Sequence, residues 1–192
     1  MQKRAPARMT VDEFLVWDAD DATGRHWQLI DGDPVLMAPA AERHGAIQSE
    51  LGRLLGNHLA ERGSPCRVIA APGIVPRVRA NENFRVPDLG VTCAPPSNEV
   101  MMQEPVLLIE ILSPSNEPET RSNVWAYTTI PSVREILIVR ATRIEAELLR
   151  RNADGSWPEE AAVLHGGETL TLASVDFSTP LLAIYRTSGL AR

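Results

Sequence analysis

Lysine is nearly missing from this chain of 192 residues, since Lys3 is the only one and arginine supplies almost all of the positive charge. The formal net charge is -6, so the molecule lacks the overall positive field that draws many proteins to nucleic acid. Any contact with nucleic acid must therefore be local. The shortage also limits catalysis, because arginine keeps its proton near neutral pH and cannot act as a base.

Cysteine is scarce, and long apolar runs are absent. Cys66 and Cys93 lack CxxC spacing, so we expect buried free thiols rather than a disulfide or a zinc site, which suits a reducing compartment. No stretch of about 18 apolar residues appears, and the polar start of the chain does not resemble a signal peptide. We therefore expect a cytoplasmic protein with no membrane contact. Four tryptophans lie outside any basic stripe, and core packing is expected for them: Trp17, Trp27, Trp125 and Trp157.

The size and composition favour a single domain with a real core. Hydrophobic residues make up 44% of the chain and charged residues 23%, as in ordinary globular proteins. We expect a flexible N-terminus at 1–9, one domain at 10–186 and a C-terminal tail at 187–192.

The apolar spacing predicts a mixed order of helices and strands. A capping-box pattern from Thr10 to Glu13 predicts a short N-terminal helix, and Asp31-Gly32-Asp33 predicts the turn of a hairpin. A helical stripe predicts a long helix over 42–62 that ends at Gly63. Further helices are predicted at 119–129 and 180–185, and strands at 66–69, 74–78, 86–93, 106–112, 134–140, 144–151 and, at a sheet edge, 169–172.

Glu110 stands out because it interrupts the most apolar run of the chain, which predicts a central strand covered on both faces. A carboxylate buried there needs compensation, either from an arginine in a structural ion pair or from a divalent cation. Asp88 begins another apolar strand 22 residues earlier, so two neighbouring strands could bring the carboxylates together. Such a pair suits Mg²⁺, which takes one or two carboxylates and completes its shell with water and phosphate.

Several blocks of sequence, in order, resemble the Uma-type family of bacterial restriction endonucleases, a branch of the PD-(D/E)XK nuclease superfamily. They span most of the chain and comprise Trp27-Gln28-Leu29-Ile30-Asp31-Gly32, Met37-Ala38-Pro39 followed by His44, Arg85-Val86-Pro87-Asp88, Leu108-Ile109-Glu110-Ile111-Leu112-Ser113-Pro114-Ser115, and Tyr127 with Pro131-Ser132-Val133-Arg134-Glu135.

The resemblance implies an α/β (α+β) fold of the restriction endonuclease type, in which helices flank a mixed central sheet. It implies that Asp88 and Glu110, with the peptide carbonyl of Ile111, hold Mg²⁺ or Mn²⁺ for phosphodiester hydrolysis. The implied substrate is nucleic acid, expected to be DNA. A homodimer is expected by analogy with enzymes that cut both strands.

The sequence departs from the family pattern where lysine is expected. The position two residues after Glu110 holds Leu112, and the following helix, where relatives often carry a lysine before the tyrosine, holds Arg121 and Asn123. Arg121 could only stabilise charge on the phosphate, and Asn123 could steady it, so the base is expected to be water activated by the metal.

Three further residues are weaker candidates for the site. Gln28 replaces a glutamate of the family's hairpin motif, and its amide oxygen could still bind the metal or a water, or simply lie on an exposed face. His44 could contact phosphate or a carboxylate, or play a structural part. Glu50, on the same helix, could approach the metal, although a solvated face is expected for it.

Two functions remain open from the sequence. The first is a divalent-metal-dependent endonuclease. The alternative is a catalytically impaired relative that serves as a nucleic-acid-binding or protein-interaction module, which the missing lysine, Gln28 and the acidic charge favour.

Overall fold

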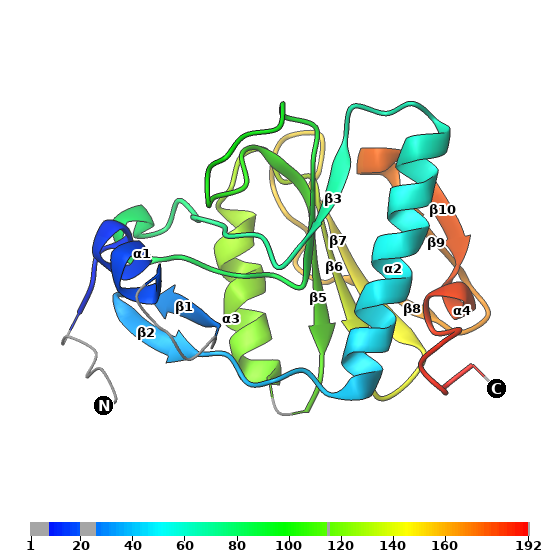
Figure 1. Ribbon diagram of the computed structural model, residues 1–192. Coiled ribbons are helices and arrows are strands. Elements are labelled where there is room, and N and C mark those ends of the chain that lie inside the picture. The colour runs from blue at the N-terminus through cyan, green and yellow to red at the C-terminus, as the bar shows by residue number, and fades with distance from the viewer. Residues whose placement is uncertain (1–7, 20–25, 115, 192) are drawn as a thin grey trace.

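The computed structural model describes residues 8–19, 26–114 and 116–191 (Figure 1). Most of the N-terminus expected to be flexible therefore lies outside the described residues. In the described part of the chain, none of the helices combines the length and apolar character needed to cross a bilayer.

A six-stranded mixed sheet forms the centre of the molecule, as predicted (Figure 1). Only β5 and β6 run parallel, and the other neighbours pair antiparallel. The long apolar run is the central strand β5, and all but one of its eight residues are buried. In sheet order the strands are β3 (Arg67–Ala70), β4 (Leu89–Thr92), β5 (Pro105–Leu112), β6 (Glu135–Arg140), β7 (Glu145–Arg150) and β8 (Ala162–His165).

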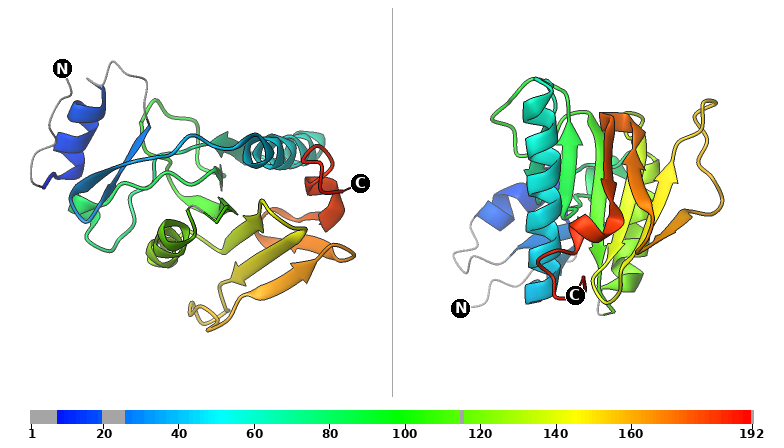
Figure 2. Two further views of the ribbon diagram at one scale, coloured as in Figure 1. Left: turned by 90° about the horizontal axis from the view of Figure 1, so that it is seen from below. Right: turned by 90° about the vertical axis from the view of Figure 1, so that its right-hand side faces the viewer.

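Two helices cover the opposite faces of this sheet, because successive side chains of β5 alternate between them. Leu107, Ile109 and Ile111 of β5 pack in one cluster with the apolar stripe of α2 (Glu42–Glu61). Leu108 and Leu112 pack in a second cluster with Val124 and Tyr127 of α3 (Glu117–Thr128). Figures 1 and 2 show the two helices on either side of the strands.

An N-terminal lobe stands beside the sheet. It contains α1 (Val11–Ala19), the hairpin of β1 (Trp27–Ile30) and β2 (Asp33–Leu36), and the short 3₁₀ helix η1 (Ala80–Glu82). The predicted capping box is present, since Glu13 N–H donates to Thr10 Oγ1 and Thr10 N–H donates to Glu13 Oε2. The lobe has its own apolar cluster around Phe14 and Leu29.

Several predictions at the ends of the sheet are wrong. The strand predicted at 169–172 is β9 (Thr169–Leu172), but it pairs with β10 (Phe177–Pro180) in a separate hairpin instead of joining the sheet edge. The strand predicted at 74–78 is reduced to isolated bridges. The short helices η2 (Ala173–Val175) and α4 (Leu181–Ile184) complete this end, and the described residues after α4 return to α2, where Thr187 Oγ1 donates to the carbonyl of Ala46.

The expectation of free thiols is also wrong, because Cys66 and Cys93 form a disulfide. The antiparallel pairing of β3 with β4 explains the disulfide. Arg67 is paired with Thr92, so one further step of this register places Cys66 opposite Cys93. Sequence spacing alone does not reveal this neighbourhood. With the disulfide, the thiols no longer support a reducing compartment.

Trp125 departs from the core packing expected of the tryptophans. Its side chain is 61% exposed on α3, whereas Trp17 and Trp27 pack on the apolar cluster of the lobe and Trp157 packs on the cluster beneath α3.

Candidate active site

The pairing of β4 with β5 brings Asp88 next to Glu110. Leu89 is paired with Ile109, and one further step of this antiparallel register sets residue 88 against residue 110, at a Cβ separation of about 5 Å for directly opposed residues. The two carboxylates named from the sequence are therefore neighbours in space.

Asp88 is held in place on both carboxylate oxygens. β4 begins at Leu89, and the Asp88 side chain takes the place of the missing strand backbone: Oδ2 accepts the Ile111 N–H at 2.6 Å. Oδ1 lies 2.7 Å from His44 Nε2, near the start of α2. Gln48 of α2 also donates to the Asp88 carbonyl at 2.8 Å. The carboxylate is thus fixed between the sheet and α2.

Glu110 is almost completely buried, with 5% of the residue exposed. Its Oε1 accepts hydrogen bonds from Tyr127 Oη at 2.8 Å and from Asn123 Nδ2 at 3.3 Å, both on α3. Among the described residues no arginine forms an ion pair with it, so the structural ion pair considered from the sequence is not formed. Burial first, and then the charge of Asp88, raises the pKa of Glu110 to about 8. Glu110 therefore lacks a direct cationic partner among the described residues.

Arg85 is linked to Glu110 through Asn123. Arg85 is 3% exposed; its Nη1 donates to Asn123 Oδ1 at 3.0 Å and its Nη2 to Asn83 Oδ1 at 2.9 Å. Its Nε has no hydrogen-bond partner in the part of the chain that the structure describes. Burial lowers the pKa of Arg85, and the charges around it, including Tyr127 and Glu110, oppose this effect. A continuous polar chain thus runs from Asn83 through Arg85 and Asn123 to Glu110.

The hairpin contributes Gln28 to the same region. Gln28 is completely buried, which excludes the exposed position considered from the sequence. Its Nε2 donates to Glu119 Oε1 on α3, and its Oε1 is buried without a hydrogen-bond partner among the described residues. Burial raises the pKa of Glu119, against the lowering effects of Arg85 and Gln28. Since Glu119 also adds to the negative potential at Glu110, three acidic groups meet here.

Two residues considered from the sequence lie elsewhere. Arg121 Nη1 and Nη2 bind Glu147 of β7 at 2.5 and 2.8 Å, and Nη2 lies 3.5 Å from Glu117. Glu50 is buried rather than solvated. Hydrogen bonds from Arg53 and Arg186 lower the pKa of Glu50 to about 2, as expected of a structural ion pair.

The donor set at the pair suits a hard divalent cation. No group of three or more histidine, cysteine, aspartate or glutamate side chains arranged for a metal is found among the described residues, so an all-protein cage is absent there. Mg²⁺ does not need one, because it keeps several waters and takes substrate phosphate as a ligand. The Ile111 carbonyl, which accepts from Asn116 Nδ2 at 3.3 Å, leaves the strand on the same side as the N–H bound by Asp88. The orphaned Gln28 oxygen and the two crowded carboxylates fit a positive ion or its water shell.

Sequence reasoning assigned no role to Arg85, Glu119 or Tyr127, all of which belong to this cluster. A signal for two of them was present, since Glu119, Asn123 and Tyr127 recur every four residues and so share one face of a helix. Arg85 offered a weaker sign, as a lone arginine in an otherwise apolar segment before Asp88.

Comparison with known proteins agrees with the family resemblance of the sequence. A model of the Uma2 family, described as "Putative restriction endonuclease", matches residues 11–182. The chain is 29% identical over 189 residues to the uncharacterized protein slr1290 of Synechocystis sp. (strain ATCC 27184 / PCC 6803 / Kazusa), covering 96% of this chain and 94% of that relative.

Among solved structures, the chain is similar to one described as a "putative nuclease belonging to DUF820 from Anabaena variabilis ATCC 29413". The TM-score is 0.73 at 16% identity, covering 94% of this chain and 99% of that one. The expected nuclease-like fold, with helices on both faces of a mixed sheet, is confirmed.

The burial of Glu110 predicts a stability that depends on pH. Its pKa is 4.5 in the unfolded chain and about 8 in the folded protein, so between these values the folded state binds more protons. The free energy of unfolding must then fall as pH rises through this window. In metal-free buffer Glu110→Gln removes this decline, so the free energy of unfolding of the variant rises relative to that of the unchanged protein as pH rises through the window. Urea unfolding across the window measures it.

Glu50→Gln serves as the control, because Glu50 is equally buried but its pKa is lowered to about 2. Its stabilisation is fully present above pH 4.5, so the cost of this variant stays constant across the window. A Glu110→Gln protein whose stability runs parallel to that of the unchanged protein over the whole window would contradict the raised pKa.

Proposed function

This chain belongs to the Uma2 family, and from that premise we propose that it is a divalent-metal-dependent endonuclease that hydrolyses phosphodiester bonds in DNA. The observation that carries the proposal is the meeting of Asp88 with the buried Glu110 at the Ile111 peptide. Two carboxylates this close repel each other when both are charged, and below about pH 8 a proton on Glu110 relieves the repulsion. A divalent cation relieves it while both groups stay ionised. The family description supports a nuclease, and DNA is the substrate of restriction enzymes.

Asp88, Glu110 and the carbonyl of Ile111 are the groups proposed to hold Mg²⁺ or Mn²⁺. When bound, the cation lowers the pKa of coordinated water and neutralises charge on the phosphate. The cation would thus activate the attacking water, a step for which this chain lacks the family's lysine. The side chains of this protein then have to orient the ligands and exclude competing water.

The hydrogen bonds around the pair perform this orientation. His44 and the Ile111 N–H fix the two oxygens of Asp88, and Tyr127 and Asn123 both bind Oε1 of Glu110. Oε2 of Glu110 accepts no hydrogen bond from a described residue and is left for the cation. Gln28 Oε1 is left to hold a water at the edge of the site. Arg121 is committed to Glu147, so Asn123 is the better placed of the two residues expected to steady the phosphate.

A homodimer is part of the proposal by analogy. Cutting both strands of a duplex requires two hydrolytic events, and a two-fold dimer presents one site to each strand.

Removing either carboxylate is expected to abolish both metal binding and cleavage. Asp88→Asn and Glu110→Gln preserve shape and remove one charge each, so calorimetric titration with Mn²⁺ should lose its signal at millimolar metal. Plasmid and oligonucleotide cleavage should fall by about 100-fold or more, the loss typical of a group that stabilises transition-state charge. Glu99→Gln, which removes an exposed carboxylate, controls for the change in net charge and should behave as the unchanged protein.

Cleavage that survives both substitutions would come from a contaminant and refute the assignment. Silence of the unchanged protein towards millimolar Mn²⁺ would also refute it. Metal binding without cleavage of any nucleic acid would point to a hydrolase with another substrate.

One observation favours the second candidate, a nucleic-acid-binding module without hydrolysis. The residue of α3 that faces Glu110 in the segment where relatives often carry a lysine is Asn123, a neutral amide. No described lysine or arginine donates directly to Glu110, which leaves any proton acceptor to the metal site itself.

Asn123→Lys should therefore restore a missing group and raise the rate of cleavage. Desolvation and the like charge of Arg85 lower the pKa of a lysine buried there, while the carboxylate of Glu110 opposes them. A net lowering suits a general base. A gain of about 100-fold is expected, the usual worth of general base catalysis. Arg121→Lys is the matched control, since position 121 lies at Glu147 instead of Glu110. Circular dichroism establishes that the variants are folded.

A folded Asn123→Lys protein no faster than Arg121→Lys would contradict this prediction. An inactive parent with an active Asn123→Lys variant would establish the second candidate for the natural chain.

A further inference from the structure

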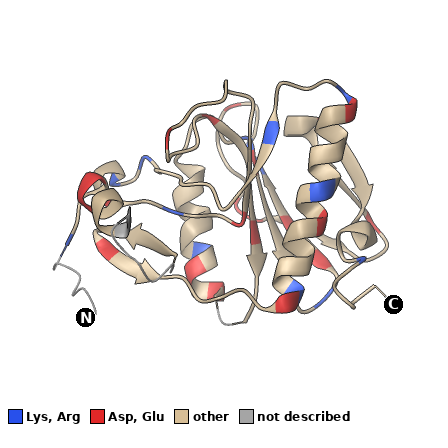
Figure 3. Ribbon diagram, in the orientation of Figure 1, with Lys and Arg blue, Asp and Glu red and all other residues tan. Residues whose placement is uncertain are grey.

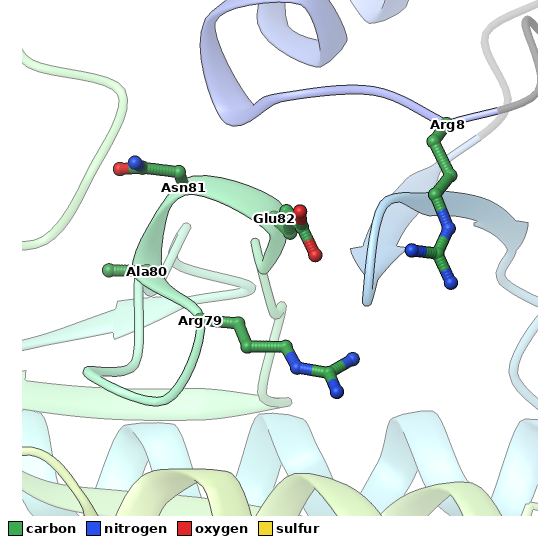
Figure 4. Close-up of a pocket in the computed structure, with 5 residues that line it drawn as sticks. All are labelled: Arg8, Arg79, Ala80, Asn81 and Glu82. Carbon is green, nitrogen blue, oxygen red and sulfur yellow. The ribbon is translucent and has the colours of Figure 1, made fainter.

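A depression of about 500 Å³ opens on the N-terminal lobe, away from the carboxylate pair. It is lined by Arg8, Arg79, Ala80, Asn81 and Glu82. Figure 4 shows the guanidinium groups of Arg8 and Arg79, which come from distant parts of the sequence, extending toward the same space. In a protein of net charge -6, two converging cations that no catalytic step uses require an explanation.

Arg8 is positioned by the turn of the hairpin. The backbone N–H of the next residue, Met9, donates to the Gly32 carbonyl at 2.8 Å. The Arg8 side chain lies so close to Gly32 that a Cβ there would meet its Cβ and Cγ at 3.4 Å, and Gly32 has a φ of +85° that side chains rarely adopt. Arg8 forms no ion pair with any residue that the structure describes, so its charge is available to a ligand.

Arg79 is positioned by a buried amide. Its backbone is left-handed, with φ of 44°, an uncommon conformation for a residue other than glycine. Asn83, completely buried, donates to the carbonyls of Val78 at 3.2 Å and Arg79 at 3.3 Å. The guanidinium lies 3.4 Å from Asp31, but both side chains are at least half exposed. Such an exposed pair is weak, and an incoming anion can compete for it.

The depression is connected to the carboxylate pair through two routes. Asn83, which clamps the Arg79 loop, also accepts a hydrogen bond from Arg85, the partner of Asn123. The β1–β2 hairpin also connects the two sites. Gln28 donates a hydrogen bond to Glu119 beside the carboxylate pair, and Gly32, four residues after Gln28, lies against the Arg8 side chain. At about 3.3 Å per strand residue, Gln28 and Gly32 lie on the order of 10–15 Å apart. A duplex covers that distance in about three to four base steps.

We propose that Arg8 and Arg79 form a phosphate-binding subsite for the backbone of the nucleic acid whose cleavage the carboxylate pair performs. This inference rests on the proposed nuclease function and adds the place where the substrate is held outside the reacting atoms. Guanidinium groups bind phosphate oxygens in pairs of hydrogen bonds. Glu82 also lines the depression, and its carboxylate points toward the same space (Figure 4). It repels a doubly charged phosphate monoester more than a singly charged phosphodiester, which favours backbone over a free nucleotide.

Duplex binding in EDTA tests the subsite without any cleavage. Arg8→Gln and Arg79→Gln should each weaken binding of a fluorescent duplex, read by anisotropy, by roughly threefold or more at 50 mM salt. Each should also reduce the slope of log affinity against log salt by about one, the signature of one lost phosphate contact. Arg143→Gln is the matched control, because Arg143 is 55% exposed and paired with Glu145, just as Arg79 is 57% exposed and paired with Asp31. It should leave affinity and slope unchanged.

The outcomes separate the subsite from the nuclease. Duplex affinity and salt slope that are equal in all four proteins, or no duplex binding by the unchanged protein, overturn the subsite whatever the cleavage assay in Mn²⁺ gives. Dependence of binding on both arginines in a protein that cleaves nothing supports the subsite and refutes the nuclease. Inorganic phosphate or a mononucleotide that binds only when both arginines are present, with duplex affinity unaffected by their loss, overturns the assignment to backbone.

Discussion

The site depends on one electrostatic constraint, the burial of Glu110 against Asp88 in the middle of a sheet. Glu110 is buried because it lies in β5, a strand that is covered on both faces and has seven of its eight residues buried. Asp88 lies just before β4, and its side chain accepts the Ile111 N–H in place of a strand carbonyl. A charged carboxylate buried there lowers the stability of the fold by roughly several kcal/mol unless an opposite charge or hydrogen bonds compensate it. The sheet that stabilises the fold thus also creates the unfavourable contact.

The protein contains two buried glutamates that meet this cost in opposite ways. Glu50 binds Arg53 and Arg186, and its pKa falls to about 2. Glu110 accepts hydrogen bonds from two neutral donors, Tyr127 and Asn123, and Arg85 binds Asn123 instead of Glu110. The pKa of Glu110 rises to about 8. Full pairing marks a structural carboxylate. A carboxylate left short of positive charge next to a second carboxylate is an arrangement common at functional sites, which is why the proposal rests on Glu110.

Much of the fold could be predicted from the sequence because the signals are local. The capping box at Thr10, the hairpin turn at Asp31-Gly32 and the apolar run around Glu110 each depend on neighbours along the chain, and each is found as predicted. The disulfide depends on the register of β3 with β4, and the hairpin of β9 with β10 depends on pairing outside the main sheet. Neither the disulfide nor this hairpin can be predicted from a local sequence pattern.

The same distinction holds within the site. Asp88 and Glu110 could be proposed from the sequence because one begins an apolar strand and the other interrupts one, and a family resemblance supplied their order. Arg85 and Glu119 were missed because their importance arises from what folds against them, namely Asn123 and Gln28. Arg121 appeared well placed by sequence position, but the helix turns it toward Glu147. Arg121 is two residues from Asn123, which faces Glu110, so the two side chains point about 200° apart around the helix.

The central claim is that the deficit of positive charge between Asp88 and Glu110 exists to receive a metal ion. Crystals soaked in Mn²⁺, with data collected at the manganese absorption edge, test it most directly. The account predicts an anomalous peak within coordinating distance of the two carboxylates and the Ile111 carbonyl, absent in crystals of Glu110→Gln. A map with no peak there at millimolar Mn²⁺, or a peak that persists in the variant, would contradict it.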